Sequence, residues 1–130
     1  MKIRKTGLLL AAGCLSLMLL TGCCPEDTKN YKQAAFDLEQ GNYEIALEEY
    51  ETAIAAGVKV AQSYRGAGVA QMKLGNYEDA ITNFTNALNS DKVGKNLKKD
   101  ILSYRAAAYL KTKAYEEALA DCQALAESYE

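Results

Sequence analysis

The sequence predicts an all-α fold, a solenoid of about three helix-turn-helix repeats that follows a cleaved N-terminal signal peptide. Three observations lead to this prediction. A short motif recurs in the 130-residue chain after 34 residues and again after 38. The chain holds a single proline, which argues against a turn-rich β fold. Its first 22 residues differ in composition from everything that follows.

Residues 1–22 are predicted to be a secretory signal peptide. The first six residues carry three cations and no acid, and residues 7–20 form an uncharged run rich in Leu and Ala. This run is shorter than the roughly 20 residues that a membrane-spanning helix needs. A basic start followed by an apolar middle and small residues is typical of an export signal. Cleavage after Gly22 would change the net charge from −2 to −5.

Residues 20–23, Leu-Thr-Gly-Cys, resemble the lipobox of bacterial lipoproteins. The resemblance implies that Cys23 receives a diacylglyceryl group on its sulfur and becomes the mature N-terminus. Two acyl chains give stable anchoring, whereas one chain binds a membrane only marginally. The alternatives are an ordinary signal peptide, or an uncleaved anchor, with a cysteine there by chance. On the lipoprotein interpretation, residues 23–27 are the lipidated cysteine and a short tether. The protein is then exported and lipid-anchored on the extracytoplasmic side of a bacterial membrane.

Residues 28–130 are predicted to form one domain of three repeats, at about 27–60, 61–94 and 95–130. Each repeat is expected to hold two helical stretches joined by a short turn. The turns are Gly41-Asn42-Tyr43, Gly75-Asn76-Tyr77 and Lys113-Ala114-Tyr115. Glycine suits a helix C-terminus and asparagine suits the N-cap of the next helix, so the first repeat is expected to form helices over 31–40 and 43–56. The third turn lacks both the glycine and the cap.

A set of equivalent positions in the three repeats is here called a column. Some columns hold small residues and others hold large ones, which predicts close packing of the helices. The small column of the first helices is Ala34, Gly68 and Ala106. It is expected to make room for the tyrosines of the turns and for Tyr50 and Phe84 of the second helices. Cys122 continues the column of Tyr50 and Phe84 and is expected to be a small buried hydrophobe. A Cys24–Cys122 disulfide suits an exported protein, but a lipid beside Cys24 disfavours it.

The repeats resemble the tetratricopeptide repeat over roughly residues 27–129. The resemblance rests on the spacing of 34, the small residue before the Gly-Asn-Tyr turn, the alanine three residues after Tyr and the aromatic four residues further on. It implies a right-handed superhelix whose first helices line a concave groove. The family's proline at the end of each repeat is absent, with Val58 and Lys92 in its place.

The resemblance also implies that this groove binds a protein or peptide partner. The family's groove positions fall on Tyr31, Ala35, Leu38, Gln62, Arg65, Val69, Met72, Asp100, Ser103, Ala107 and Leu110. Arg65 is the main cation among them, with Asp100 as its candidate countercharge. An alternative interpretation places Leu38, Met72 and Leu110 between the repeats as packing residues. Family members that grip C-terminal carboxylates of chaperones use Lys, Asn and Arg here, and this chain lacks them, so such a clamp is not expected.

No catalytic or metal site is predicted, and the only cofactor-like group expected is the lipid on Cys23. The chain has no histidine, which removes histidine-based general bases and Cys/His metal sites, and it has no Gly-rich phosphate loop. Its net charge gives no footprint of nucleic-acid binding. The acidic cluster at Glu48, Glu49 and Glu51 is interpreted as a solvated face. The lysines in 92–99 are interpreted as a loop and helix start, with contact to anionic headgroups or an acidic partner as the alternative.

The predicted function is that of a non-enzymatic, membrane-anchored scaffold or adaptor in the bacterial cell envelope. A pilotin-like accessory, which carries a client protein to the membrane for secretion or outer-membrane assembly, is the alternative. An enzyme or small-ligand receptor would need an enclosed pocket with convergent polar groups. The last helix is expected to leave apolar surface around Leu119, Cys122 and Leu125 for a partner or for self-association, unless a longer chain covers it.

Overall fold

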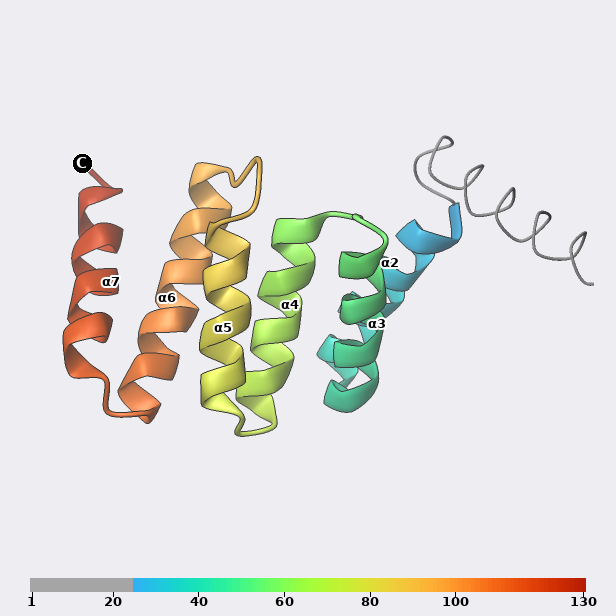
Figure 1. Ribbon diagram of the computed structural model, residues 1–130, viewed down its shortest axis with the longest axis horizontal. Coiled ribbons are helices and arrows are strands. Elements are labelled where there is room, and N and C mark those ends of the chain that lie inside the picture. The colour runs from blue at the N-terminus through green and yellow to red at the C-terminus, as the bar shows by residue number, and fades with distance from the viewer. Residues whose placement is uncertain (1–24) are drawn as a thin grey trace, which may run out of the picture.

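Six helices follow one another in antiparallel pairs in the computed structural model, which describes residues 25–130 (Figure 1). Their bounds are α2 (Pro25–Gln40), α3 (Tyr43–Ala55), α4 (Val60–Lys73), α5 (Tyr77–Leu88), α6 (Lys95–Lys111) and α7 (Tyr115–Glu127). Each helix contacts the next one along the row. Residues 25–130 contain no strand, so the predicted all-α solenoid is confirmed. The predicted signal peptide and Cys23 lie outside the described residues.

The turn within each pair has the same hydrogen-bonding pattern, set by a residue with positive φ. After α2, the N–H of Gly41 donates to the carbonyl of Leu38, and the N–H of Asn42 donates to the carbonyl of Asp37. This Schellman arrangement satisfies two carbonyls at the helix end and needs a left-handed residue, which Gly41 supplies with φ of 85°. Gly75 does the same after α4 with φ of 82°. The predicted helix ends at the two glycines are confirmed.

The third turn keeps this geometry without a glycine. Lys113 adopts φ of 62°, and its N–H donates to the carbonyl of Leu110 while the N–H of Ala114 donates to that of Tyr109. A left-handed conformation costs a residue with a Cβ about 1–2 kcal/mol. The missing glycine therefore changes the energy of the turn and leaves its shape unchanged.

The predicted side-chain caps at Asn42 and Asn76 are wrong. Neither side chain bonds to the start of its own helix. Asn42 Nδ2 instead donates to Asp37 Oδ1 at 2.8 Å, and Asn76 Nδ2 donates to Gln71 Oε1 at 2.8 Å. The reason is the backbone: ψ of 65° at Asn42 lies outside the extended region in which a cap side chain reaches the following N–H groups. Both asparagines thus tie the turn back to the preceding helix.

The first helix begins earlier than the sequence suggested. α2 starts at Pro25, whereas a helix over 31–40 and a tether over 23–27 were expected. Proline lacks the N–H that a first helical turn leaves unpaired anyway, so it is tolerated there. In the sequence, only one residue separates Cys23 from the first helical residue.

Two apolar clusters form the core, and glycines of α4 admit the aromatic rings between the helices. A Cβ placed on Gly68 would lie 2.6 Å from the Phe84 ring, and one on Gly66 would overlap the Tyr50 ring. Phe84 of α5 is fully buried and also stacks on Tyr104 of α6, with ring centroids 5.8 Å apart. The prediction that the small column makes room for Phe84 is confirmed.

Two predictions about the third pair are wrong, because the outer face of α7 is exposed. Cys122 is exposed rather than a buried hydrophobe, and Tyr115 is 63% exposed, although Tyr43 and Tyr77 in its column are half-buried. In the first two pairs, Tyr50 and Phe84 of the Cys122 column pack against the helix that follows, α4 and α6 respectively. α7 has no such neighbour within the described residues.

Candidate partner-binding groove

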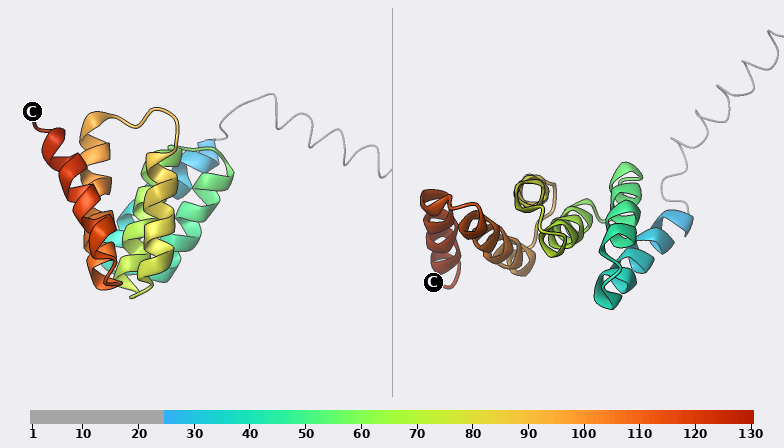
Figure 2. Two further views of the ribbon diagram at one scale, coloured as in Figure 1. Left: turned by 60° about the vertical axis from the view of Figure 1, so that its left-hand side comes forward. Right: turned by 90° about the horizontal axis from the view of Figure 1, so that it is seen from below.

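The first helices of the three pairs, α2, α4 and α6, bring most of the predicted groove residues onto one surface. α2 contacts α4, and α4 contacts α6, across the intervening second helices. Figure 2 shows α4 and α6 on one side of the row and α5 on the other. A shallow depression of about 300 Å³ lies between these helices. It is lined by six of the eleven predicted residues, Tyr31, Ala35, Leu38, Gln62, Arg65 and Asp100, together with Glu39, Tyr50 and Leu97.

The remaining predicted residues do not line this depression. The prediction that Val69 lines the groove is wrong. Val69 is 6% exposed and packs in the core, because it lies on the side of α4 that faces α5 and α6. Met72 is half-buried against the same core, and Leu38 packs there as well as lining the groove, as the packing alternative predicted for both. Leu110, in contrast, is 54% exposed. Ala107 is half-buried.

Ser103 lies beside a second shallow depression, of about 340 Å³, at the α6 end of the surface. Asn96, Lys99, Asp100 and Tyr129 line it with Ser103. The Ser103 hydroxyl donates to the carbonyl of Lys99 at 3.0 Å, and Lys99 Nζ lies 3.7 Å from the centroid of the Tyr129 ring. Asp100 borders both depressions, so the predicted groove residues of α4 and α6 meet at this carboxylate.

Arg65 and Asp100 form the predicted charge pair. Arg65 Nε donates to Asp100 Oδ2 at 2.6 Å, and the guanidinium carbon lies 5.0 Å from the centroid of the Tyr104 ring. Both side chains are partly exposed. The bond to Asp100 uses one of the five N–H donors of the guanidinium. The pair therefore fixes the orientation of Arg65 in the groove and leaves its charge largely neutralised.

An aromatic wall closes the groove on the side of the first pair. Tyr31 and Tyr50 meet edge to face, with centroids 6.1 Å apart, and Lys59 Nζ lies 4.8 Å from the centroid of the Tyr31 ring. Burial, and to a lesser degree the neighbouring Tyr31, raises the pKa of Tyr50 to about 12. Tyr50 thus remains a neutral phenol at physiological pH. The surface combines aromatic and aliphatic area with the amide of Gln62 and one ion pair, a mixture suited to holding a peptide.

A second ion pair, between Arg105 and Asp121, was not identified from the sequence. Arg105 of α6 is bonded through Nε and Nη2 to the two carboxylate oxygens of Asp121 in α7, at 2.7 Å and 2.6 Å. The column comparison contains a signal for it. Asp121 stands in the column of Glu49 and Arg105 in that of Gln33, so a carboxyl recurs in one column while the other column changes from an amide to a guanidinium.

Glu49 corrects the interpretation of the acidic cluster as a solvated face. Glu48 and Glu51 are exposed, but Glu49 Oε2 is buried and has no hydrogen-bond partner. Burial, and then the charge of Asp37, raises the pKa of Glu49. Asp37 has the opposite behaviour, because the amides of Asn42 and Gln33 donate to its carboxylate and lower its pKa.

The described helices offer neither a metal-binding cluster nor a membrane span. Residues 25–130 hold no group of three or more His, Cys, Asp or Glu side chains that could bind a metal ion. None of the helices in this range is both long and apolar enough to cross a membrane.

The missing prolines at the repeat ends have a structural counterpart. Val58 is buried, and its N–H donates to the carbonyl of Ala53 at 2.9 Å, a bond that proline could not make. Gly57 precedes it with φ of 72°, which gives this turn the same hydrogen-bonding pattern as the turns inside the pairs.

Comparison with known proteins agrees with this architecture. A family model described as tetratricopeptide repeat matches residues 31–88 and 66–130. The two matches overlap in the middle pair and together extend from α2 through α7. No curated protein matches the sequence closely enough to count as a relative. The three helical pairs and the extent of the family match show that the chain belongs to the tetratricopeptide repeat family.

Proposed function

We propose that this protein is a non-enzymatic adaptor that a lipid on Cys23 holds to the extracytoplasmic face of a bacterial membrane. In this proposal, the groove binds an extended segment of another envelope protein. The observation that carries the proposal is the depression in which residues of all three first helices meet, from Tyr31 in α2 through Arg65 in α4 to Asp100 in α6. Repeat arrays of this family commonly bind protein partners along such surfaces.

The chemistry of the groove favours a peptide with an apolar side chain and an accessible backbone. An apolar side chain would pack against Tyr31 and Leu38, which supply aromatic and aliphatic area. A backbone carbonyl would accept from the remaining N–H groups of Arg65 or from the Gln62 amide. A free carboxylate is a poor match, because Asp100 already neutralises Arg65 and Glu39 lines the same depression. The expected ligand is therefore an internal segment.

The proposed anchor would hold this groove close to the lipid surface. The support for the anchor is the sequence of residues 1–23, and its geometric consequence follows from the early start of α2. One intervening residue spans less than about 4 Å beyond the lipidated cysteine. A partner segment would then have to approach along the membrane surface or reach it from a neighbouring membrane protein.

Site-specific photo-crosslinking in cells tests the groove directly. A photoreactive residue at Ala35, which lines the depression, is expected to capture one discrete protein, and Arg65→Glu is expected to abolish the product. Lys73→Glu, an equal charge change at an exposed position of the same helix outside the depression, serves as the matched control. Equal capture by the Arg65→Glu variant and the unaltered groove would overturn the proposed binding surface.

Metabolic labelling with a clickable fatty acid tests the anchor independently of the groove. Cys23→Ser is expected to lose the label, whereas Cys122→Ser retains it. A label that survives Cys23→Ser contradicts the lipoprotein assignment and leaves the groove result unaffected. The same cells distinguish the two roles considered for the adaptor. If deletion of this protein moves one client away from its membrane, the pilotin-like role is favoured. If the clients stay at their membrane but their complex falls apart, the scaffold role is favoured.

A further inference from the structure

Both loops between the helical pairs lie along one edge of the array, called here the loop edge. The start of α2, the loop at 56–59, the loop at 89–94 and the end of α7 follow one another along this edge (Figure 1). The turns inside the pairs lie along the opposite edge, called here the turn edge. The helices of each pair are antiparallel, so α2, α4 and α6 begin at the loop edge, whereas α3, α5 and α7 begin at the turn edge.

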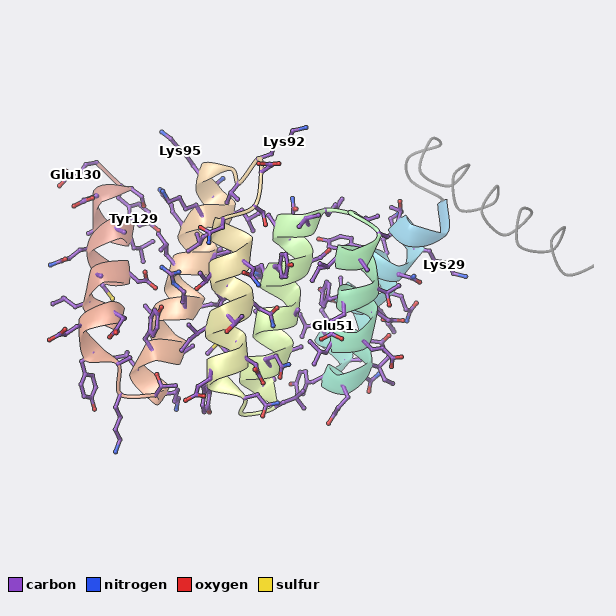
Figure 3. The ribbon with its side chains drawn as sticks, in the orientation of Figure 1. Lys29, Glu51, Lys92, Lys95, Tyr129 and Glu130 are labelled. Carbon is purple, nitrogen blue, oxygen red and sulfur yellow. The ribbon has the colours of Figure 1, made fainter. Side chains whose placement is uncertain are left out.

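Four exposed lysines gather on the loop edge and are defined here as the lysine patch: Lys59, Lys92, Lys95 and Lys98. Lys59 and Lys92 come from different loops but line the same depression of about 650 Å³. Lys95 and Lys98 lie at the start of α6, and helical side chains lean toward the N-terminus of their helix, which here points to the loop edge. Figure 3 shows Lys92 and Lys95 projecting outward from this edge.

The lysine patch meets little opposite charge among the described residues. Both ion pairs in residues 25–130 are made by arginines, so none of these lysines is paired with a described carboxylate. Asp91 is the one acid in the two loops, and the first turns of α4 and α6 hold none. The other acids of the loop edge lie at its two ends, at 26–27 in α2 and at Glu127 and Glu130. The middle of the loop edge is therefore positively charged.

The stability of the helices does not account for the lysines at the start of α6. A helix N-terminus carries partial positive charge, so acids stabilise it and cations destabilise it. The helices that begin at the turn edge follow this rule, with Glu44, Glu78 and Glu116 in their first turns. α6 instead begins with Lys95 and has no acid in its first turn. These cations are unfavourable for the helix and indicate a role outside the packing of the domain.

The acids of the turn edge are too distant to cancel the lysine patch. α4 has 14 residues, which makes it about 21 Å long. At physiological ionic strength, charges in water are screened over about 8 Å. A negatively charged surface at the loop edge would therefore interact with the lysine patch and only weakly with Glu78 or Glu116 at the turn edge. The net charge of −2 for the whole chain does not exclude an anionic partner here.

We propose that the lysine patch binds the headgroups of anionic phospholipids, so that the loop edge faces the membrane. Lysines close to a bilayer are attracted by its negative surface potential. The inference deepens the proposed function and rests on it at one point, the lipid on Cys23, which would attach the chain one residue before α2 and thus at the same edge. The anchor would raise the effective concentration of the patch at the lipid surface. The groove along α2, α4 and α6 would then open sideways, along the membrane plane, because the helices would stand upright.

Vesicle flotation of an unlipidated chain tests the patch without the anchor. The full chain with Cys23→Ser is mixed with vesicles of phosphatidylcholine alone, or of phosphatidylcholine and phosphatidylglycerol in equal parts. The patch variant adds Lys92→Gln, Lys95→Gln and Lys98→Gln. The control variant adds three changes at exposed lysines of the turn edge, Lys73→Gln, Lys111→Gln and Lys113→Gln. Both sets remove the same charge, and each contains one left-handed lysine. Lys59 stays unchanged because it also contacts the Tyr31 ring of the groove.

We expect the patch variant to bind the anionic vesicles at least about tenfold more weakly than the control variant, since one lysine near an anionic surface contributes about fivefold. Both variants should bind the neutral vesicles equally. The cations of residues 1–6 also favour anionic vesicles, but they are present in every chain and cancel in the comparison. High salt should remove the difference between the variants. Equal binding of the two variants to anionic vesicles would overturn the proposal.

A fluorescent probe reports which edge faces the vesicle. The remaining thiols are first removed by Cys14→Ser, Cys24→Ser and Cys122→Ser. The probe is then attached at Gly94→Cys on the loop edge, where a Cβ meets no atom within 4 Å, or at Gln40→Cys on the turn edge. Anionic vesicles with a quencher on their headgroups should quench position 94 several times more than position 40, and the patch variant should lose most of this difference. Equal quenching at both positions, or a difference that the patch variant retains, contradicts the proposed orientation.

These readouts separate failure of the patch from failure of the anchor. The flotation chain carries no lipid, so a fatty-acid label that survives Cys23→Ser would refute the anchor and leave the patch result unchanged. Equal binding of the two variants would refute the patch and leave the label on Cys23 in place. An acidic protein at the lysine patch predicts a different pattern. Vesicle binding would not depend on the patch, and a photoreactive residue at Gly94 would capture a protein that the patch variant loses, which would overturn the lipid proposal.

Discussion

Arg105 and Asp121 form a bidentate ion pair that joins the last two helices. Nε of Arg105 lies 2.7 Å from Oδ2 of Asp121, and Nη2 lies 2.6 Å from Oδ1. Nη1 of the same guanidinium also donates to the Thr85 hydroxyl of α5 at 3.1 Å. The hydrogen bonds to Asp121 raise the pKa of Arg105 above its ordinary value. The third helical pair has Cys122 where the first two have an aromatic ring. The ion pair between Arg105 and Asp121 therefore supplies a contact between α6 and α7 that aromatic packing supplies elsewhere.

Removal of one partner of this ion pair should destabilise the protein strongly. Asp121→Ala leaves a largely buried guanidinium without its countercharge, so we expect the free energy of unfolding to fall by about 2–4 kcal/mol. Urea unfolding followed by circular dichroism measures it. The double variant Arg105→Met with Asp121→Leu should recover most of the loss, because both charges are gone. A loss no greater than that of the surface variant Glu117→Ala would show that the pair contributes little.

Replacement of Gly68 should be far more costly than replacement of Gly94. Gly68→Ala puts a methyl group 2.6 Å from the Phe84 ring in a closely packed core, and overpacking of this kind costs about 1–3 kcal/mol. A methyl group on Gly94 would meet no atom within 4 Å, and Gly94 has an ordinary negative φ, so Gly94→Ala should change stability by less than about 0.5 kcal/mol. Thermal or urea unfolding of both variants provides the comparison, and equal losses would contradict the close approach of α4 and α5.

A glycine at position 113 should stabilise the third turn. In Lys113→Gly, the residue in the left-handed conformation no longer carries a Cβ, which removes a cost of about 1–2 kcal/mol. The same change increases the conformational entropy of the unfolded chain. We expect a net gain of about 0.5–1 kcal/mol in the free energy of unfolding. Lys98→Gly, at an exposed position inside α6, should instead lose about 1 kcal/mol. Losses of the same sign at both positions would argue against the turn geometry at Lys113.

Glu49 should make the protein less stable as the pH rises above the ordinary carboxyl range. Its folded-state pKa is raised, so the folded state holds a proton that the unfolded chain has released above about pH 4.5. The contribution of Glu49 is therefore fully present below that pH and is lost as the pH rises through the folded-state pKa. Glu49→Gln should remove this decline and stabilise the protein at neutral pH, because the carboxyl whose Oε2 is buried beside Asp37 can no longer ionise.

Asp37 provides the contrast for this pH dependence. Its pKa is lowered by the amides of Asn42 and Gln33, so its contribution is present above its ordinary value of 3.8 and is lost as the pH falls below it. Urea unfolding of the protein and of Glu49→Gln across pH 3 to 8 separates the two carboxyls. Parallel stability curves for the two proteins would mean that Glu49 is solvated in the same way when folded and unfolded.

The helical pairs were predictable because their signals are local. Gly41 and Gly75 mark helix ends through a backbone conformation that needs no information from the rest of the chain, and the columns of Gly68 and Phe84 recur in register with the turns. The groove was predictable in part for the same reason. Tyr31, Arg65 and Asp100 share a depression because equivalent positions of consecutive repeats point in one direction. The start of α2 at Pro25 was not predicted, although proline is tolerated in the first turn of a helix.

By itself, the sequence determined the repeat, its turns and the class of fold, because periodicity and backbone conformation act over a few residues. It also carries the only support for the export signal and for lipid on Cys23. Only the tertiary structure decided which side chains of a column are covered. Val69 is buried by α5 and α6, whereas Cys122 is exposed on the outer face of α7. Asp121 has Arg105 as its partner, whereas Glu49 in the same column has no partner for its buried oxygen. Lys113 adopts the left-handed conformation that glycine adopts in the other turns. Burial and pairing depend on which helices lie alongside, and the packing of the array fixes that.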